Sequence, residues 1–338
     1  GAAATGPAVL VKEYILRVDS NCLVITFAPV EGESSFAFVN AIEVVSAPAD
    51  LISDLARAES GNGYRNWTLS RQALETVHRI NVGGPKVTPF NDTLWRTWTA
   101  NDESFLEPES SSSVSRTVAF SGRLNRRKGG ASREVAPDNV YSTCRMADSS
   151  NLRWVFNVNP GYKYLVRMHF CDIVSWALNE LYFNIIINSD IVYKDFDLSE
   201  SAGQLLASPY YIDFVVSPDS VGLLTLGIDS CKLTIPSKAV GLLNGLEVFK
   251  INNSVGSLDG ELSVDAVLQS PTKGGFLVFL RSLMCGFAFV SLVLVAFKLV
   301  MRLKAETRNP VAWLPLPLDS AEASTVLPYK TSVGYRFI

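Results

Sequence analysis

Apolar and polar side chains alternate along several segments of this chain, and that alternation constrains the fold more than any other feature. It is present in residues 162–170, 181–187, 212–216 and 224–228. A period of two places every second side chain on one face of a strand. Clusters that favour turns, such as Asn159-Pro160-Gly161, separate these segments. Many short strands joined by turns predict an all-β protein folded as a β-sandwich.

The segment Phe276–Phe297 differs from these strands because it is long, apolar and almost uncharged. As a helix rising about 1.5 Å per residue, it would match a hydrocarbon core about 30 Å thick. Basic residues dominate after it and acidic residues before it, so the positive-inside rule places residues 1–273 outside the cell. The sequence therefore predicts one transmembrane helix, 274–298, in a single-pass type I protein of the plasma membrane. The alternative is a buried core helix, but the sequence that follows is too short to bury one.

Charge and metal-ligand content exclude several classes of function. The 30 Lys and Arg against 33 Asp and Glu give a net charge of -3, so no nucleic-acid partner is expected. With 2 His and 5 Cys, and no Cys-x-x-Cys spacing, no metal site and no cofactor are predicted. Disulfides would be permitted outside the cell, but sequence alone assigns no pair among Cys22, Cys144, Cys171 and Cys231.

One segment of the chain is repeated. Phe38–Val45 is similar to Leu242–Phe249, at an offset of 244 − 40 = 204 residues. The repeat predicts a structural unit that occurs twice, with only the closing strands of its first copy present. The predicted organisation is the C-terminal part of a first domain (1–53), a linker (54–72), a complete second domain (73–255), an extracellular juxtamembrane segment (256–273), the span (274–298) and a cytoplasmic tail without a kinase (299–338).

Several motifs in the predicted second domain are specific enough to indicate a family. In chain order they are Asn81–Pro85 with Asn91–Trp98, Arg133–Tyr141, His169–Ile173 and Asn179–Asn184. Together they make the chain resemble the ectodomain of the plant malectin-like receptor kinases related to Feronia and Theseus. The resemblance covers about residues 9–255.

The resemblance implies tandem malectin-like β-sandwiches outside the cell, one complete and one partial in this chain, followed by the single span. It also implies partners, namely secreted cysteine-rich peptides of the rapid alkalinisation type, GPI-anchored co-receptors and, for some members, cell-wall pectin. Full-length members carry a cytoplasmic kinase. This chain departs from the pattern because most of the first sandwich and the whole kinase are expected to be missing.

No catalytic residues are predicted. A kinase needs a Gly-rich loop, a strand Lys, a catalytic Asp and a metal-binding Asp, and no such motifs follow Lys304. Asp172 and Glu180 could be proposed as the acid pair of a glycan-active enzyme, but the preferred interpretation is that they order a turn and a loop. His78 and His169 lie on strand-like segments, where a polar-face His is the simpler interpretation. The chain is therefore not expected to be an enzyme.

Three groups of residues are candidate sites. The predicted topology makes three sequons candidate glycosylation sites, Asn66, Asn91 and Asn252. Two tryptophans could stack on a sugar or anchor a partner, although burial against a sheet is the preferred interpretation for both, Trp95 and Trp98. A Ser- and Gly-rich loop carries a basic run, Arg123, Arg126, Arg127, Lys128 and Arg133. This run is either a solvated loop or a contact for anionic pectin or an acidic partner.

The preferred function is a receptor-like ectodomain at the cell surface that binds secreted peptides and co-receptor proteins in cell-wall sensing and growth signalling. A cell-wall lectin is an alternative from another class, and it would need ordered loop aromatics around a cleft. A truncated product without native function is a third possibility. An exposed apolar surface would favour peptide recognition over sugar binding.

Overall fold

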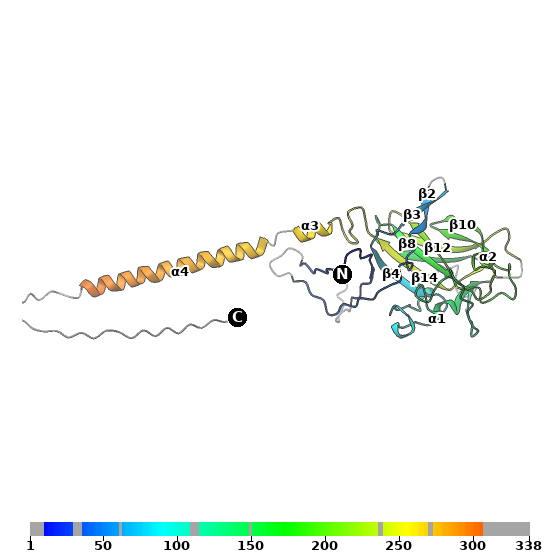
Figure 1. The fold of residues 1–338 in the computed structure, drawn as a ribbon. Helices are drawn as coiled ribbons and strands as arrows, with labels where there is room; N and C mark the ends of the chain where they lie inside the picture. Colours follow the sequence, from blue (N-terminus) through cyan, green and yellow to red (C-terminus); the bar gives the residue numbers. More distant parts are fainter. Residues whose placement is uncertain are drawn as a thin grey trace, which may run out of the picture. The chain divides into compact units, whose positions relative to one another are not determined.

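The alternating segments fold as strands of a β-sandwich. The computed structural model describes residues 10–29, 36–60, 63–108, 115–148, 151–235, 239–269 and 273–306. The chain divides into two compact units, Gly1–Pro271 and Thr272–Ile338, and all the described strands lie in the first (Figure 1). The prediction of a β-sandwich for the region before the apolar segment is confirmed.

The larger layer of the first unit is a seven-stranded sheet with the order β1-β4-β14-β8-β11-β2-β3. Its members are β1 (Tyr14–Ile15), β2 (Leu55–Ser60), β3 (Gly63–Thr68), β4 (Leu74–Asn81), β8 (Tyr164–Phe170), β11 (Tyr210–Val216) and β14 (Gly245–Ile251). The central strands β4, β14, β8 and β11 pair antiparallel, and β2 joins β11 in parallel.

Two smaller sheets complete the unit, with the orders β10-β9-β12-β7 and β13-β6-β5. Their members are β5 (Ser115–Ala119), β6 (Thr143–Ala147), β7 (Leu152–Asn157), β9 (Tyr182–Ile187), β10 (Asp190–Asp197), β12 (Leu223–Ser230) and β13 (Gly241–Leu243). Short helices lie in the connections: η1 (Pro89–Asn91), η2 (Asp102–Phe105), α1 (Asp138–Tyr141) and α2 (Leu198–Ser201). Another, α3 (Val264–Gln269), follows the last strand.

The main hydrophobic core is built from alternate residues of all three sheets. In β8, Val166, Met168 and Phe170 belong to this core, so Arg167 and His169 lie on the other face of the same strand. A layer of loops covers that outer face, because Arg167 and His169 are buried as well. The large sheet is therefore enclosed on both faces. The main core packs on one side, and the other side carries buried polar residues together with a smaller apolar cluster that includes Leu165.

The loop layer over the outer face depends on Gly83. This residue has a φ of +69°, and a Cβ there would lie 2.3 Å from the carbonyl oxygen of Cys144. A side chain would therefore be excluded both by strain and by space. The segment that follows Gly83 carries Trp98, which packs edge-on against His169 of the sheet. Tyr141 approaches the same ring from the end of α1.

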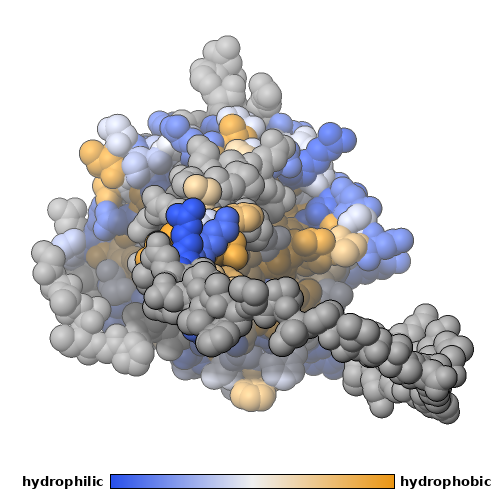
Figure 2. All heavy atoms as spheres, turned by 90° about the vertical axis from the view of Figure 1, so that its left-hand side faces the viewer, coloured by the Kyte–Doolittle hydropathy of each residue, from blue (hydrophilic) through white to orange (hydrophobic). Residues whose placement is uncertain are grey.

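Residues 10–46 do not form the closing strands that the repeat predicts. In the described part of this segment, only Tyr14–Ile15 is a strand. Most of its apolar side chains are exposed, as Val24 at 78% and Phe38 at 69% illustrate, whereas Ile15 packs against the sheet. Figure 2 shows one face of the molecule, on which hydrophobic side chains lie open beside hydrophilic ones. The prediction is wrong here because residues 38–45 have no strand-pairing partner among the described residues, whereas β14 is paired on both sides.

The predicted linker, 54–72, contains two paired strands. β2 and β3 form an antiparallel hairpin at one edge of the large sheet. Ala56, Ala58 and Leu69 are buried in a second cluster with Leu165 and Val215. This segment therefore contributes two strands to the large sheet, where the sequence predicts a linker.

The second unit contains α4 (Lys273–Glu306), and the predicted span 274–298 falls within it. The side chains of Arg281 and Cys285 lie outside the described residues, as does the tail from 307 to 338. Of the helices that the structure describes, none combines enough length with enough apolar character to cross a bilayer.

Candidate functional site

A row of four charged side chains crosses the outer face of the large sheet. The strand register places Arg79, Glu247, Arg167 and Asp213 side by side on β4, β14, β8 and β11. Arg79 Nε lies 2.6 Å from Glu247 Oε1, and two nitrogens of Arg167 each lie 2.8 Å from an Asp213 oxygen. Charges alternate along the row, so each side chain faces an opposite charge on the next strand. All four residues are buried beneath the loop layer.

His169 connects this row to the loop layer. Its Nε2 lies 3.2 Å from Glu247 Oε2, and its Nδ1 lies 2.9 Å from the Tyr141 hydroxyl. Burial lowers the pKa of His169 even though Glu247 opposes that shift. Burial acts to raise the pKa of Glu247, but the charge of Arg79 and the bond with His169 hold it well below its usual range. Tyr141, His169 and Glu247 are each 0% exposed, so this network stabilises the fold and no ligand reaches it.

Part of the basic run is neutralised by Asp138 of α1. Arg126 Nη2 lies 2.6 Å from Asp138 Oδ1, and Arg133 Nη2 lies 2.8 Å from Oδ2. Burial acts to raise the pKa of Asp138, but these two arginines outweigh it and the pKa is lowered. Arg126 also donates to the backbone carbonyls of Ala131 and Ala136. Arg126 and Arg133 therefore hold the loop together, which reduces their availability to an anionic ligand.

The rest of the basic run lies at the surface. Arg127 donates to the carbonyl of Ser201, 3.0 Å away, and thereby attaches the basic loop to α2. Arg123 and Lys128 are exposed. Neither forms a hydrogen bond or an ion pair with the described part of the chain. These two residues, with Arg127, are the part of the run that an acidic partner can approach.

The two candidate tryptophans, Trp95 and Trp98, both contact Asp92 but differ in exposure. Its buried carboxylate accepts a hydrogen bond from Trp98 Nε1 at 2.9 Å and pairs with Arg96. Trp98 is 0% exposed, so the core interpretation is confirmed for it. Trp95 is 53% exposed and has a φ of 59°, so the core interpretation is wrong for that residue. Only Trp95 of the pair can meet a ligand.

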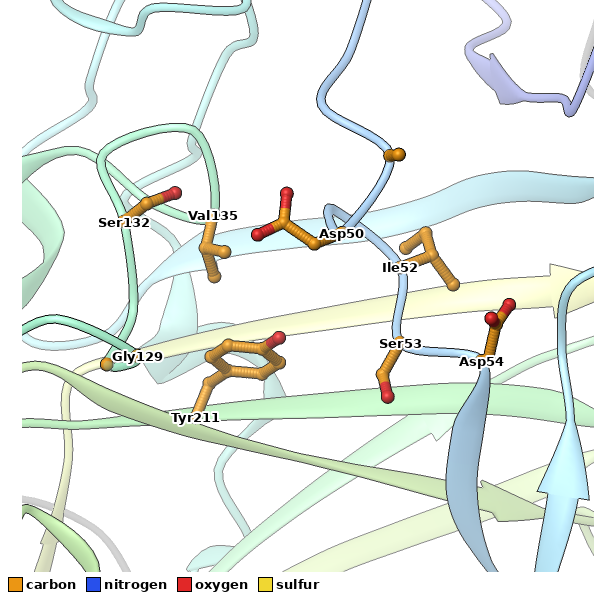
Figure 3. Close-up of a pocket in the computed structure, with 10 residues that line it drawn as sticks. Asp50, Ile52, Ser53, Asp54, Gly129, Ser132, Val135 and Tyr211 are labelled. Carbon is orange, nitrogen blue, oxygen red and sulfur yellow. The ribbon is translucent and has the colours of Figure 1, made fainter.

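A pocket of about 440 Å³ lies between residues 49–54 and the loop 129–135 (Figure 3). Asp50 faces Val135 across it, and the Tyr211 ring lies below them in this view. Burial raises the pKa of Tyr211, whose ring has the Arg167 guanidinium 4.4 Å from its centroid. The lining offers carboxylates and hydroxyls but a single aromatic ring, Tyr211. It therefore provides hydrogen bonding without the set of stacking rings that a lectin needs for a neutral sugar.

Sequence analysis missed Trp176, which is 91% exposed. The backbone of its loop is fixed by the two carboxylates that we predicted to order a turn and a loop. Asp172 Oδ1 accepts the amides of Val174 and Ser175, and Glu180 Oε2 accepts the amide of Trp176 at 3.1 Å. Burial raises the pKa of Asp172. An isolated Trp in a segment without strand alternation is the sequence signal that could have indicated it.

The Trp176 loop meets the basic loop through the segment around α2. The Asn179 amide donates to Ser199 Oγ at 2.8 Å, and the Ala207 amide donates to the Asp172 carbonyl at 2.9 Å. Two further apolar residues of these loops, Leu178 and Leu205, are 37% and 40% exposed. We define the Trp176 surface by five residues, Trp176, Leu178, Leu205, Arg127 and Lys128. It combines an apolar anchor with positive charge.

The predicted glycosylation sequons lie at separate places. Asn66 in β3 and Asn91 at the end of η1 are exposed. Asn252 is half-buried, and its Oδ1 accepts the amide of Ala73 at 2.7 Å. The structure therefore brings no two of these asparagines together, and Asn66 and Asn91 are the more accessible.

The cysteines and acidic residues offer no reactive centre in the described part of the chain. Four cysteines are free thiols, and Cys144 and Cys171 are buried. Burial raises the pKa of Cys144 to about 12 and that of Cys171 still further, so both stay protonated. No group of three or more His, Cys, Asp or Glu is arranged to hold a metal ion within the described ranges.

The fold and its accessible loops define a β-sandwich binding module of the malectin-like kind. The Malectin-like domain matches residues 2–251, and the chain belongs to this family. It is 44% identical over 295 residues to the probable receptor-like protein kinase At5g24010 of Arabidopsis thaliana, covering 82% of this chain and 35% of the relative. It is 41% identical to receptor-like protein kinase THESEUS 1 of Arabidopsis thaliana, covering 76% of this chain and 30% of the relative.

A solved structure supports the same assignment. The fold is similar to a chain in the crystal structure of the plant peptide RALF23 in complex with FER and LLG2, with a TM-score of 0.50 and 30% identity. That similarity covers 58% of this chain and 53% of the other. The chain spans about a third of the length of the two kinases above. The resemblance to the Feronia and Theseus group is thereby confirmed.

Proposed function

We propose that this chain is the extracellular binding part of a plant cell-surface receptor, and that it binds a secreted cysteine-rich peptide together with a GPI-anchored co-receptor. The observation that carries the proposal is the 91% exposed side chain of Trp176 on a loop whose backbone is held by hydrogen bonds. Tryptophan is enriched among the residues that dominate protein interfaces. Because hydrogen bonds already order its loop, binding would cost little additional conformational entropy. The FER complex with RALF23 and LLG2 supports the same class of partner.

The charge of the Trp176 surface indicates the partner's chemistry. Arg127 and Lys128 belong to the basic loop, which Arg127 attaches to α2 through the Ser201 carbonyl. Positive charge at the rim of an interface accelerates association with an acidic surface and contributes less to final affinity. The expected partner surface is therefore an apolar pocket with carboxylates at its edge.

Calorimetry on the full-length chain in detergent micelles tests this proposal. We expect the alkalinisation-type peptide and its co-receptor to bind together, and Trp176→Ala to weaken that binding tenfold or more, as expected for a dominant interface residue. Trp95→Ala is the matched control, since it removes an exposed indole from another loop, and it should leave the affinity unchanged. Micromolar binding of a neutral diglucoside with none of the peptide would instead establish the lectin alternative.

Pectin is a second candidate ligand because Arg123 and Lys128 are exposed and unpaired in the described part of the chain. Exposed charges are screened by salt, so binding of pectin fragments should be weak and should disappear as ionic strength rises. The double variant Arg123→Ala, Lys128→Ala should abolish it. Binding that survives both changes would exclude Arg123 and Lys128 as the pectin contact.

We also propose that residues 274–298 anchor the receptor in the plasma membrane as a single-pass type I protein, with residues 1–273 outside. The almost uncharged segment Phe276–Phe297 and its basic C-terminal flank support this topology. The proposal includes glycans on Asn66, Asn91 and Asn252, and an origin of residues 1–53 from a first malectin-like domain. Translation into microsomes followed by protease should leave a protected, glycosylated fragment that lacks the C-terminal tail. Complete digestion would contradict the proposed topology.

A further inference from the structure

Two exposed aromatic rings lie beside the sequon at Asn91. Phe90 is 86% exposed and Trp95 is 53% exposed, and their ring centroids are 5.8 Å apart with an interplanar angle of 57°. Asn91 is itself exposed and directly follows Phe90. The two rings therefore form a small apolar surface that projects from the fold next to a glycosylation sequence.

The loop holds this surface in place. The buried carboxylate of Asp92 accepts the amide of Leu94 at 2.8 Å and the Trp98 indole N–H at 2.9 Å, and the Asp92 carbonyl accepts the amide of Trp95 at 3.0 Å. Trp95 has a left-handed φ of 59°, which is strained for a bulky residue. Strained backbone of this kind persists only where the surrounding structure imposes it, and it is concentrated at functional positions.

We propose that Phe90 and Trp95 form a stacking platform for the first N-acetylglucosamine of a glycan on Asn91. The C–H face of a sugar packs against aromatic rings, and the attachment through Asn91 would bring the sugar to them without an association cost. The sequon is Asn91-Asp92-Thr93, and the Thr93 hydroxyl donates to the Arg133 carbonyl at 3.2 Å. The occupant is thus part of the glycoprotein itself, and it covers apolar surface that is otherwise exposed.

The other two sequons lack such a platform and provide internal controls. Next to Asn66, the Trp67 ring is half-buried. The ammonium of Lys163 already lies over this ring, 5.1 Å from its centroid. At Asn252, the side-chain oxygen is already bonded to the Ala73 amide. Stacking is therefore expected at Asn91 and at neither of the others.

The test uses the full-length chain secreted into the endomembrane system of plant cells and trimmed enzymatically to one sugar per site. Mass mapping should find Asn91 occupied, and its acetyl methyl resonance should be shifted upfield by ring currents relative to those at Asn66 and Asn252. Trp95→Ala and Phe90→Ala should each reduce that shift while Asn91 stays occupied. An unoccupied Asn91, or an acetyl resonance that matches the control sites, would overturn the proposal.

Thermal unfolding gives a second readout. Asn91→Gln, which removes the glycan but keeps the bond from the Thr93 hydroxyl to the Arg133 carbonyl, should lower the melting temperature by about 2–4 °C, the shift expected for a modest loss in a domain of this size. In the Trp95→Ala background, the same change should have little further effect. Equal losses in both backgrounds would mean that the sugar stabilises the loop without the rings, which contradicts the proposal. Peptide binding involves the separate Trp176 surface, so its failure would leave this result unaffected.

Discussion

β14 and residues 38–45 are similar in sequence but differ in structure. β14 pairs with β4 on one side and with β8 on the other, and Leu246 and Val248 are buried in the main core. Residues 38–45 form no described strand, and Phe38 and Val44 are each 69% exposed. The difference teaches that a strand pattern specifies which face will be apolar, whereas the strand itself forms only where neighbouring strands supply hydrogen bonds and packing.

The N-terminal segment nevertheless contacts the sandwich at β4. β1 pairs with β4. The Glu13 carboxylate accepts hydrogen bonds from Arg79 Nη1 at 2.6 Å and from Arg79 Nη2 at 2.5 Å. Arg79 is therefore shared between Glu13 of this segment and Glu247 in the centre of the sheet. Changes at the two carboxylates compare the two regions directly.

The largest effect is expected from Glu247→Ala. It would leave the fully buried Arg79 guanidinium without its partner on β14, and removing one member of a buried pair costs about 3–5 kcal/mol. Urea denaturation should show this loss in the free energy of unfolding. Glu247→Gln keeps a hydrogen-bond acceptor and should cost less. A loss below about 1 kcal/mol for the alanine variant would mean that the charged row does not stabilise the sheet.

A smaller effect is expected from Glu13→Ala. The Glu13 side chain is 37% exposed, so water screens its interaction with Arg79. We expect a loss of about 1 kcal/mol in the same denaturation experiment, because Arg79 keeps Glu247. A loss equal to that of Glu247→Ala would mean that the Glu13 pair with Arg79 stabilises the fold as much as the Glu247 pair in the centre of the sheet.

The third prediction concerns the dependence of stability on pH. His78 packs against Phe105 and Phe156, with ring centroids 5.0 Å away in each case, and burial lowers its pKa from the ordinary value of 6.5. A lowered pKa contributes stability that is fully present above pH 6.5 and is lost as the pH falls towards the folded-state pKa. His78→Phe should therefore weaken the loss of stability on acidification. An unchanged slope of unfolding free energy against pH would contradict this.

The smallest effect is expected in the N-terminal segment. Val24→Ser replaces a side chain that is 78% exposed and should change the free energy of unfolding by less than about 0.5 kcal/mol. The matched change Val248→Ser, in the main core, removes apolar packing and buries a hydroxyl, so it should cost about 2 kcal/mol or more. Similar losses for the two variants would show that residue 24 has a packing environment like that of residue 248.

Sequence alternation was sufficient to predict the strands that became β8, β9, β11 and β12, because each has one face in the core. It was insufficient for β2 and β3, which fall in the predicted linker 54–72, since only the register with β11 shows that β2 belongs to the sheet. The basic run was found, but its internal pairing with Asp138 depends on a turn of chain that no linear pattern reveals. Trp176 was missed because exposure is a property of the folded loop.

Hydrogen exchange on the full-length chain, with and without the peptide and co-receptor, tests the central claim most directly. In the free protein, we expect strong protection of β8, β11 and β14 and weak protection of residues 10–29 and 36–46. On binding, new protection should appear in residues 172–180 and 198–208, around the Trp176 surface. New protection confined to residues 10–46, with none in the Trp176 loop, would contradict the claim that the folded sandwich carries the binding surface.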